Sequence, residues 1–275
     1  MDLSNVLEIA TCSDTGIVRE RNEDAVFASP RFGIAVLADG MGGYNAGEVA
    51  SSMATTVLGD DLEKSLAVAS TREYQFDGAG DPYHLLKTEI GRANIAIYEA
   101  AQSQAQYAGM GTTLVMAFFF DNAVTVAHVG DSRLYRWRGE QLQQLTRDHS
   151  LLQEQLDSGM ITPEQARTAQ NRNLVTRALG VDPDVEIEIR NYDTRPGDIY
   201  LLCSDGLNDM IEDAEIALAL SALSANLEVC AAQLVQMAND SGGRDNVSVI
   251  LVRVRDVYPV GGSWWTRLLA RWRRN

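Results

Sequence analysis

The sequence predicts an α+β fold: a four-layer αββα sandwich in which two central antiparallel β-sheets are flanked by pairs of antiparallel helices. Strand-like runs come first, then two helical segments, more strands, two more helices and a last strand. This order fits two packed sheets with helices outside, and it does not fit a doubly wound parallel sheet. Runs such as residues 34–38 are apolar without interruption, which is typical of strands buried on both faces. The 275 residues, 45% of them hydrophobic, allow one large domain or two small ones.

Helical and strand-like segments occupy distinct blocks of the chain. Apolar residues recur at helical spacing over about residues 46–66, 83–106, 213–223 and 227–239. Strand-like runs occupy residues 6–13, 34–38, 185–193, 198–205 and 246–254. Residues 112–146 read as a meander of strands with hairpin turns at Asp121-Asn122 and Arg138-Gly139.

The stretch 148–180 differs from its surroundings because it is polar, partly helical and poor in core residues. The sequence "TPEQA" inside it predicts a helix start with Thr162 as the cap and Pro163 at the first position. We interpret the stretch as an insertion over a site.

The net charge of −15 limits the classes of partner. A protein this acidic repels nucleic acid phosphates, so we expect no nucleic acid binding. A solvated acidic surface explains most of the excess, and part of it can also hold cations.

Three cysteines bear on the compartment. Cys12, Cys203 and Cys230 lie far apart with no metal-ligand spacing. An odd count without a pairing pattern suits a reducing compartment. The N-terminus shows no signal-peptide pattern, and the longest apolar run, residues 114–120, is too short to span a bilayer. We therefore expect a cytoplasmic protein.

Carboxylates recur where strand-like runs end or begin. The residues concerned are Asp39, Asp131 and Asp205 at strand ends, Asp245 before the last strand, and Glu23 and Asp24 before an early one. Several carboxylates that point together repel one another unless a cation neutralises them. Hard divalent cations prefer oxygen ligands, so the pattern favours a Mg²⁺ or Mn²⁺ site, with two ions as one arrangement. A single Asp-Gly is by itself more typical of a turn.

Eight motifs in order resemble one family. They are "SDTGIVRERNEDA", "VLADGMGG", "GTTL", "AHVGDSRLYRWR", "LTRDHS", "NLVTRALG", "LLCSDGLND" and "GGRDNVSVI", spread over about residues 5–255. Together they resemble the bacterial metal-dependent serine/threonine protein phosphatases of the protein phosphatase 2C family. The resemblance implies hydrolysis of phosphoserine and phosphothreonine in proteins by a hydroxide that bridges two divalent ions. It also implies that the protein opposes a bacterial serine/threonine kinase.

The resemblance assigns metal ligands residue by residue. Asp39 would bridge two Mn²⁺ or Mg²⁺ ions, and Asp205 and Asp245 would complete the first site. The carbonyl of Gly40 would bind the second ion, with Glu23 acting there through water. Asp131, together with Asp205, would hold a third ion.

Other matched residues would bind phosphate or support the ligands. Arg19 matches the phosphate-binding arginine, whose planar fork suits a phosphoryl group better than a lysine does. Asp24 and Asn246 would hold the metal ligands in place without binding the ions themselves. Two of the cysteines, Cys203 and Cys230, lack the phosphate-cradling loop of a cysteine-dependent phosphatase.

The group that protonates the leaving oxygen stays open. Animal relatives carry a histidine where this chain has Met41, and bacterial relatives often carry one where it has Tyr44. Metal-bound water, His149 and Tyr44 are therefore the candidates for the general acid.

The insertion matches the variable flap beside the active site of the family. Within it, Arg172, Asn173, Thr176 and Arg177 either meet the substrate or only anchor the flap. We expect residues 1–256 to form a single phosphatase catalytic domain that carries this flap at about 150–180.

Residues 257–275 read as a hinge and a basic, aromatic tail, with the sequence "GGSWWTRLLARWRRN" at 261–275. Such a segment can lie on an anionic membrane, dock in a partner protein or fold back on its own acidic surface. We expect a monomer whose partners are phosphorylated protein substrates and a cognate kinase.

Two other functions compete with an active protein phosphatase. One is a catalytically silent module that binds phosphoproteins, and the other is a hydrolase of small phosphate esters. A silent relative would usually lack a member of the metal set, and here Arg19, Glu23, Asp39, Asp205 and Asp245 are all present.

Overall fold

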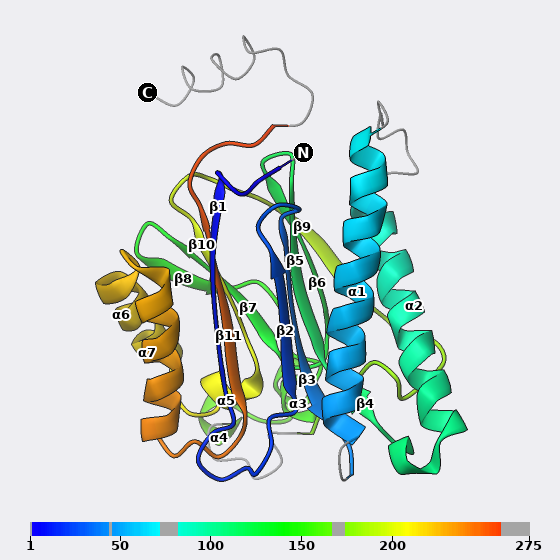
Figure 1. The fold of residues 1–275 in the computed structure, drawn as a ribbon. Coiled ribbons are helices and arrows are strands. Elements are labelled where there is room, and N and C mark those ends of the chain that lie inside the picture. Colours follow the sequence, from blue (N-terminus) through cyan, green and yellow to red (C-terminus); the bar gives the residue numbers. More distant parts are fainter. Residues whose placement is uncertain (1, 44–45, 72–81, 167–173, 260–275) are drawn as a thin grey trace.

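Two antiparallel β-sheets form the centre of the computed structural model, which describes residues 2–43, 46–71, 82–166 and 174–259 (Figure 1). One sheet has the strand order β1 (Leu7–Asp14), β11 (Val247–Val254), β10 (Ile199–Cys203), β7 (Arg133–Arg138) and β8 (Gln141–Gln144). The other has the order β2 (Asp24–Ser29), β3 (Ile34–Met41), β5 (Leu114–Phe120), β6 (Ala123–Val129) and β9 (Glu188–Asp193), and β4 (Gly111–Thr112) pairs with β3.

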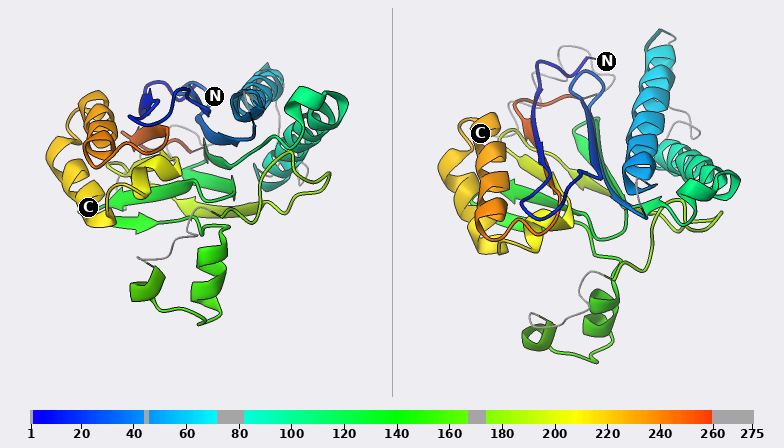
Figure 2. Two further views of the ribbon diagram at one scale, coloured as in Figure 1. Left: turned by 90° about the horizontal axis from the view of Figure 1, so that it is seen from below. Right: turned by 60° about the horizontal axis from the view of Figure 1, so that its bottom comes forward.

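Helix pairs cover the outer faces of the two sheets (Figures 1 and 2). The helices α1 (Ala46–Thr71) and α2 (Pro82–Ser103) lie on the sheet that contains β3. The helices α6 (Asp213–Leu223) and α7 (Leu227–Asp240) lie on the sheet that contains β11. This arrangement confirms the predicted four-layer αββα sandwich.

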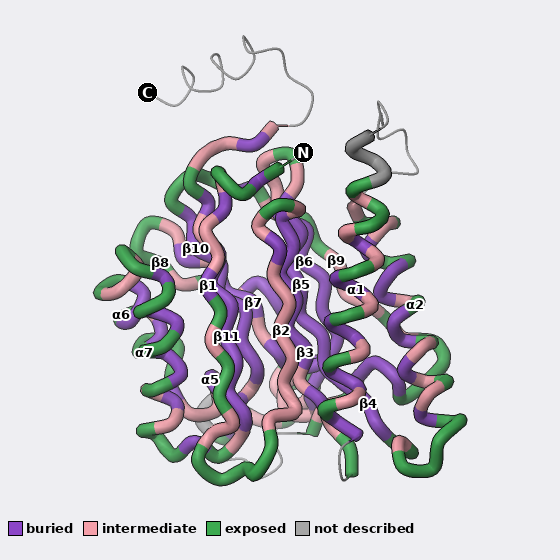
Figure 3. The backbone as a smooth tube through the Cα atoms, in the orientation of Figure 1, coloured by how far each residue is buried: buried purple, intermediate pink, exposed green. Residues whose placement is uncertain are grey.

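The four layers enclose three hydrophobic cores, and the central strands supply two of them at once (Figure 3). In β3, Ile34, Val36 and Ala38 face the helices α1 and α2. The alternate residues Ala35 and Leu37 face the other sheet. Successive side chains of a strand point to opposite faces, so a strand between two cores must be apolar throughout. Burial on both faces, which the sequence predicted, therefore explains the uninterrupted apolar run at residues 34–38.

The hairpin turn between β5 and β6 falls where it was expected. Asp121 and Asn122 both have positive φ, 50° and 58°, as the two central residues of a type I′ turn require. In the hairpin of β7 and β8 the positive φ values belong to Gly139 and Glu140, 55° and 61°. This turn lies one residue later than predicted.

The predicted single meander over residues 112–146 is wrong. The strands β5 and β6 pair in one sheet, and β7 and β8 pair in the other. The chain crosses between the sheets at Gly130, which has φ 105°. A Cβ atom there would lie 2.7 Å from the side chain of Thr113. Strand-like apolar patterns stand on both sides of this crossing, so the local pattern does not show the change of sheet.

The helix bounds differ from the predictions mainly at α1 and α2. The first helix extends to Thr71, beyond the expected end near residue 66, and α2 ends at Ser103. The helix α6 matches the predicted 213–223. Every helix among the described residues is too short or too polar to span a bilayer.

Short helices form the remaining elements: η1 (Ala105–Tyr107), α3 (Leu151–Asp157), α4 (Pro163–Ala166) and α5 (Asp205–Asn208). The two helices α3 and α4 of the insertion project from the sandwich (Figure 2). As predicted, α4 begins at Pro163, and Thr162 and Gln165 cap it reciprocally through backbone N–H groups.

Most of the connections that carry candidate residues lie at one end of the sandwich, at the bottom of Figure 1. The β1–β2 loop, the end of β3, the crossing from β6 to β7, the start of α5 and the loop before β11 all reach this end. The fold thereby gathers residues that are far apart in the sequence.

Candidate metal and phosphate site

Hydrogen bonds to its backbone hold Asp39 at the end of β3. Its backbone N–H donates to Oγ1 of Thr113 at 3.1 Å. Its carbonyl accepts from the N–H of Thr113 and from Oγ1 of Thr112, both at 2.8 Å. Thr113 also shares a 2.7 Å hydrogen bond with Oγ of Ser132, beside Asp131. The end of β3 is thus tied to the point where the chain crosses between the sheets.

Four further carboxylates lie around Asp39. Asp24 is its register partner across β2 and β3. Burial raises the pKa of Asp39 well above its usual value, and the charges of the neighbouring carboxylates raise it further. Those neighbours are Asp24, Asp205, Asp131 and Asp245. The protein therefore places Asp39 among these acids at the cost of its ionisation.

Asp205, Asp24 and Asp131 also have raised pKa values. Burial, followed by the charges of Asp131 and other carboxylates, raises the pKa of Asp205 well above its usual value. Burial is also the main cause that raises the pKa of Asp24 and of Asp131 to about 6. Cations bound between these groups would offset their repulsion.

The donor set fits hard divalent cations. Oδ1 of Asp205 and Oδ1 of Asp24 are buried and have no hydrogen-bond partner among the described residues. A buried carboxylate oxygen without a donor is costly unless something else satisfies it. The gathered donors are all oxygens, which Mg²⁺ and Mn²⁺ prefer.

Asp24 and Asn246 hold the elements of the site together. Oδ2 of Asp24 accepts from Oγ of Ser204 at 2.8 Å, immediately before Asp205. Asn246 is 5% exposed; its Nδ2 donates to the carbonyls of Thr15 and Arg21, at 2.9 and 2.7 Å. Its Oδ1 accepts from the N–H of Glu23 at 2.7 Å. The Asn246 side chain therefore fixes the β1–β2 loop onto the loop before β11.

Gly40 is required by packing against α1. A Cβ atom on Gly40 would lie 2.1 Å from the carbonyl oxygen of Gly47 and 2.7 Å from that of Glu23. A Cβ atom on Gly47 would in turn lie 2.7 Å from Oε1 of Glu23. The absence of two side chains lets the first turn of α1 approach Glu23 and the end of β3.

Arg19 projects from the β1–β2 loop beside this cluster. The N–H groups of Ile17 and Val18 donate to the carbonyl of Gly243, at 2.8 and 3.1 Å. Arg19 then donates to Oδ2 of Asp245 at 2.7 Å. This hydrogen bond is the main cause that raises the pKa of Arg19. Its side chain is 50% exposed, so the guanidinium can still meet a ligand from solvent.

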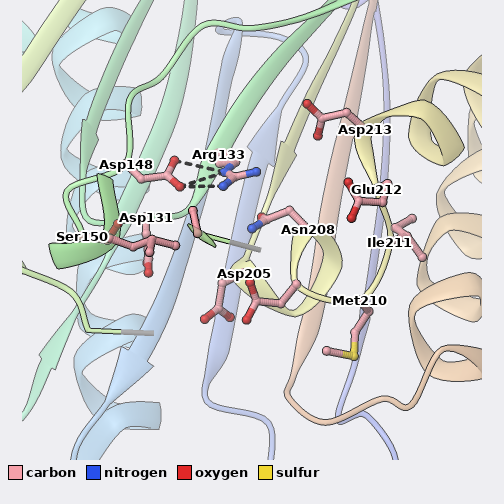
Figure 4. A pocket seen from close by; sticks show the side chains of 13 residues that line it. Asp131, Arg133, Asp148, Ser150, Asp205, Asn208, Met210, Ile211, Glu212 and Asp213 are labelled. Atoms are coloured by element: carbon pink, nitrogen blue, oxygen red, sulfur yellow. Dashed lines mark hydrogen bonds and ion pairs between the residues drawn. The ribbon is translucent and has the colours of Figure 1, made fainter. Parts of the chain in front are cut away.

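A pocket of about 320 Å³ opens beside Asp131 and Asp205 (Figure 4). Flap residues including Ser150 and Leu152 form one wall, and the segment after α5 forms the other. Arg133 lies in it and is held by Asp148, with Nη2 2.7 Å from Oδ2. Figure 4 shows the hydrogen bonds between Arg133 and Asp148 as dashed lines.

His149 is buried at the base of the flap. Its ring is 8% exposed and stacks on His128 with 4.7 Å between centroids. Burial, followed by the neighbouring His128 and Arg177, lowers the pKa of His149 to about 4. The ring is therefore neutral near pH 7.

The structure brings together Arg19, Glu23, Asp24, Asp39, Gly40, Asp131, Asp205, Asp245 and Asn246. Of the flap candidates, Arg177 pairs with Glu186 at 3.0 Å, and the N–H of Thr176 donates to the carbonyl of His149 at 2.8 Å. Both contacts hold the base of the flap. Tyr44, Arg172, Asn173 and the predicted tail, apart from its first residues, lie outside the described residues.

The sequence did not predict several residues that hold the candidate ligands and the base of the flap in place. Thr112 and Thr113 belong to the motif "GTTL". The sequence predicted no role for their hydroxyl groups, which form hydrogen bonds with the backbone of Asp39. No motif of the sequence assigns a role to His128 or Glu188 either. Possible ligand atoms of His128, His149 and Glu188 lie within 4.8 Å of one another. Their separation in sequence hides this proximity.

Comparisons with known proteins agree with the geometry. Residues 17–242 match the family model described as Protein phosphatase 2C. The chain is 39% identical over 253 residues to the serine/threonine protein phosphatase PstP of Mycobacterium tuberculosis, covering 91% of this chain and 46% of PstP. It thus spans about half the length of that relative.

Two further matches cover nearly the whole of the compared chains. The chain is 38% identical over 252 residues to the serine/threonine phosphatase stp of Listeria monocytogenes, covering 90% of this chain and 96% of stp. The crystal structure of the PstP catalytic domain in complex with 2 manganese ions matches with a TM-score of 0.77 at 37% identity. That match covers 91% of this chain and 99% of the other.

Proposed function

Because the chain belongs to the protein phosphatase 2C family, we propose that it removes phosphate from phosphoserine and phosphothreonine in proteins, in a reaction that requires Mn²⁺ or Mg²⁺. The observation that carries this proposal is the convergence of buried carboxylates on Asp39, with a pKa raised well above its usual value. The unpartnered Oδ1 of Asp205 supports it. The two manganese ions in the PstP catalytic domain support two ions here.

The family resemblance assigns the ligands, and the placement of the side chains supports this assignment. Asp39 lies centrally and would contact both ions, with Asp205 and Asp245 on one side. The carbonyl of Gly40 and, through water, Glu23 would serve the other. Asp131 and Asp205 would hold a third ion. Bound divalent ions supply Lewis acidity and lower the pKa of water.

Arg19 would bind the phosphoryl group. Its guanidinium is held beside the carboxylates by Asp245 and is half exposed. A planar fork can donate two parallel hydrogen bonds to phosphoryl oxygens. Arg19 would thus orient the group and offset the charge that develops on its oxygens.

The leaving oxygen needs a proton, and the described residues favour water as its source. A histidine acid must be protonated at the working pH, whereas the pKa of His149 is lowered to about 4. The ring also lies buried against His128. Tyr44 remains a candidate only on the grounds of the sequence.

The substrate and its setting complete the proposal. The substrates would be phosphorylated proteins, and the protein would oppose a serine/threonine kinase. The cysteines Cys12, Cys203 and Cys230 are all unpaired, which supports a cytoplasmic, reducing location.

Phosphate release from a phosphothreonine peptide tests the proposal. Wild type with Mn²⁺ should be active, and Asp39→Asn and Asp205→Asn should each lose about 100-fold or more, as expected for loss of transition-state charge stabilisation. Asp184→Asn, on the exposed loop before β9, is the matched control and should keep full activity. Peptide binding without turnover by the wild type would support the silent binding module instead.

A further inference from the structure

Two hydrogen bonds join His149 to Gly130. The backbone N–H of His149 donates to the carbonyl of Gly130 at 2.9 Å. The backbone N–H of Gly130 donates to Nδ1 of the His149 ring at 3.2 Å. Gly130 immediately precedes Asp131, so the ring acts on the segment that presents this carboxylate.

The same histidine closes the base of the flap. Ser150, the next residue, is the N-cap of α3 and accepts from the N–H of Gln153. The carbonyl of His149 accepts from Thr176 at 2.8 Å, where the chain returns from the flap. One residue therefore contacts both ends of the flap and the backbone beside Asp131.

Hydrogen-bond chemistry fixes the tautomer of the ring. A backbone N–H can only donate, so Nδ1 of His149 must carry a lone pair. The proton of the neutral ring is then on Nε2, which lies 3.7 Å from Oε2 of Glu188. In the stacked partner, Nε2 of His128 donates to the carbonyl of Arg147 at 2.8 Å.

This tautomer argues against two other tasks for the cluster. Nε2 of His149 carries its proton and has no lone pair left for a metal ion, although Glu188 and His128 lie nearby. General acid catalysis would need the imidazolium, in which Nδ1 would itself carry a proton and lose its bond to Gly130. The lowered pKa of His149 favours the neutral ring.

We propose that His149 is a positioning residue, whose Nδ1 lone pair holds the Gly130 N–H and thereby fixes Asp131 relative to the base of the flap. This inference rests on the proposed function, because it gives Asp131 a task in phosphate hydrolysis. Asp131 is 6% exposed and lines the pocket under the flap together with Ser150. A small shift of Gly130 would displace Asp131 relative to Ser150 on the flap wall of that pocket.

Two amide variants separate positioning from acid catalysis. Asparagine carries its amide oxygen on Cγ, where histidine carries Nδ1, whereas glutamine carries its amide one carbon further out, nearer the place of Nε2. Both variants remove the ring, its stacking on His128 and any imidazolium. Only His149→Asn can keep an acceptor for the Gly130 N–H.

Amide hydrogen exchange of the metal-free protein provides the first readout. Protection of the Gly130 amide should be similar in wild type and His149→Asn, and should fall about tenfold or more in His149→Gln, because a buried donor then loses its partner. Equal protection in both variants would overturn the proposal. This readout does not depend on phosphatase activity, so it also stands if the proposed function fails.

Kinetics with Mn²⁺ and a phosphothreonine peptide provide the second readout. His149→Asn should keep kcat/KM within about threefold of wild type and leave the pH–rate profile unchanged, and His149→Gln should lose about tenfold or more. Equal, large losses of kcat in both variants with an altered profile would show acid catalysis and overturn positioning. Full activity in both would equally overturn it.

Discussion

The Arg19 guanidinium donates a 2.7 Å hydrogen bond to Oδ2 of Asp245, so the phosphate-binding candidate and a metal-ligand candidate are in direct contact. They lie 226 positions apart in the chain. The contact forms because the β1–β2 loop packs on the loop before β11 through the carbonyl of Gly243. The pair joins the two halves of the proposed site.

Replacing Arg19 tests its role in phosphate binding. Arg19→Ala should lower kcat/KM for a phosphothreonine peptide by about 10- to 100-fold, because hydrogen bonds to charged groups contribute about 1.5–3 kcal/mol. Arg19→Lys keeps the charge but loses the fork, so it should recover only part of this loss. Steady-state kinetics measure both. The exposed Arg31→Ala serves as the control, and an Arg19→Ala enzyme with wild-type kinetics would exclude the assignment.

The raised pKa values predict how Mn²⁺ stabilises the protein. The pKa values of Asp24 and Asp131 are raised to about 6 in the folded state, so folding favours their protonated forms. In the metal-free protein these groups stabilise the fold at low pH, and the effect is lost as pH rises through about 6. Bound Mn²⁺ replaces these protons. The increase in the Tm of the protein on adding Mn²⁺ should therefore be large at about pH 7.5 and small at about pH 5.

Two comparisons separate this effect from other titrations. His149 acts in the opposite sense, because its lowered pKa makes the fold lose stability as pH falls from about 6.5 to about 4. Asp205→Asn should raise the Tm of the metal-free protein near neutral pH and diminish the gain with Mn²⁺. Thermal unfolding measures these Tm values. A wild-type Tm increase with Mn²⁺ that does not depend on pH would show that the carboxylates do not exchange protons for the metal.

Two glycine substitutions should have opposite effects on stability. Gly40→Ala places a Cβ atom 2.1 Å from the carbonyl oxygen of Gly47, so it should destabilise by about 1–3 kcal/mol through overpacking. Gly91→Ala, in the interior of α2, meets nothing within 4 Å and should stabilise by about 1 kcal/mol through helix propensity. Urea unfolding measures both. Equal effects of the same sign would show that the approach of α1 to β3 is described wrongly.

Asn246 should matter for both stability and activity. Asn246→Ala removes three side-chain hydrogen bonds to Thr15, Arg21 and Glu23, so it should cost about 3 kcal/mol of stability at about 1 kcal/mol for each. It should also raise KM, since Arg19 stands on the loop that it holds. The exposed Asn191→Ala is the control. An unchanged KM would mean that the loop keeps its place without Asn246.

Much of the fold could be predicted because its central strands carry two cores. Residues 34–38 are apolar without a break, and this pattern has few explanations besides burial on both faces. The helix 213–223 and the Asp121-Asn122 turn were confirmed at the expected residues. The family inferred from the eight motifs was confirmed by the match over residues 17–242.

The errors arose where local pattern carries no long-range information. The crossing at Gly130 looked like one more position in a meander, because strand alternation continues on both sides of it. The clustering of His128, His149 and Glu188 depends on the pairing of β6 with β9, which no local spacing reveals. The glycine at position 40 was explained by its carbonyl, whereas the structure adds that α1 leaves no room for a Cβ atom.

In the proposed mechanism, the carboxylates around Asp39 and Asp205 hold divalent ions on which phosphoprotein hydrolysis depends. The most direct measurement is a Mn²⁺ titration of the metal-free protein in which bound metal and phosphate release from a phosphothreonine peptide are followed together. We expect no phosphate release in EDTA, release that rises only as about two ions bind, and loss of both metal binding and phosphate release in Asp205→Asn. Phosphate release that persists in EDTA, or an Asp205→Asn protein with wild-type metal binding and activity, would contradict this mechanism.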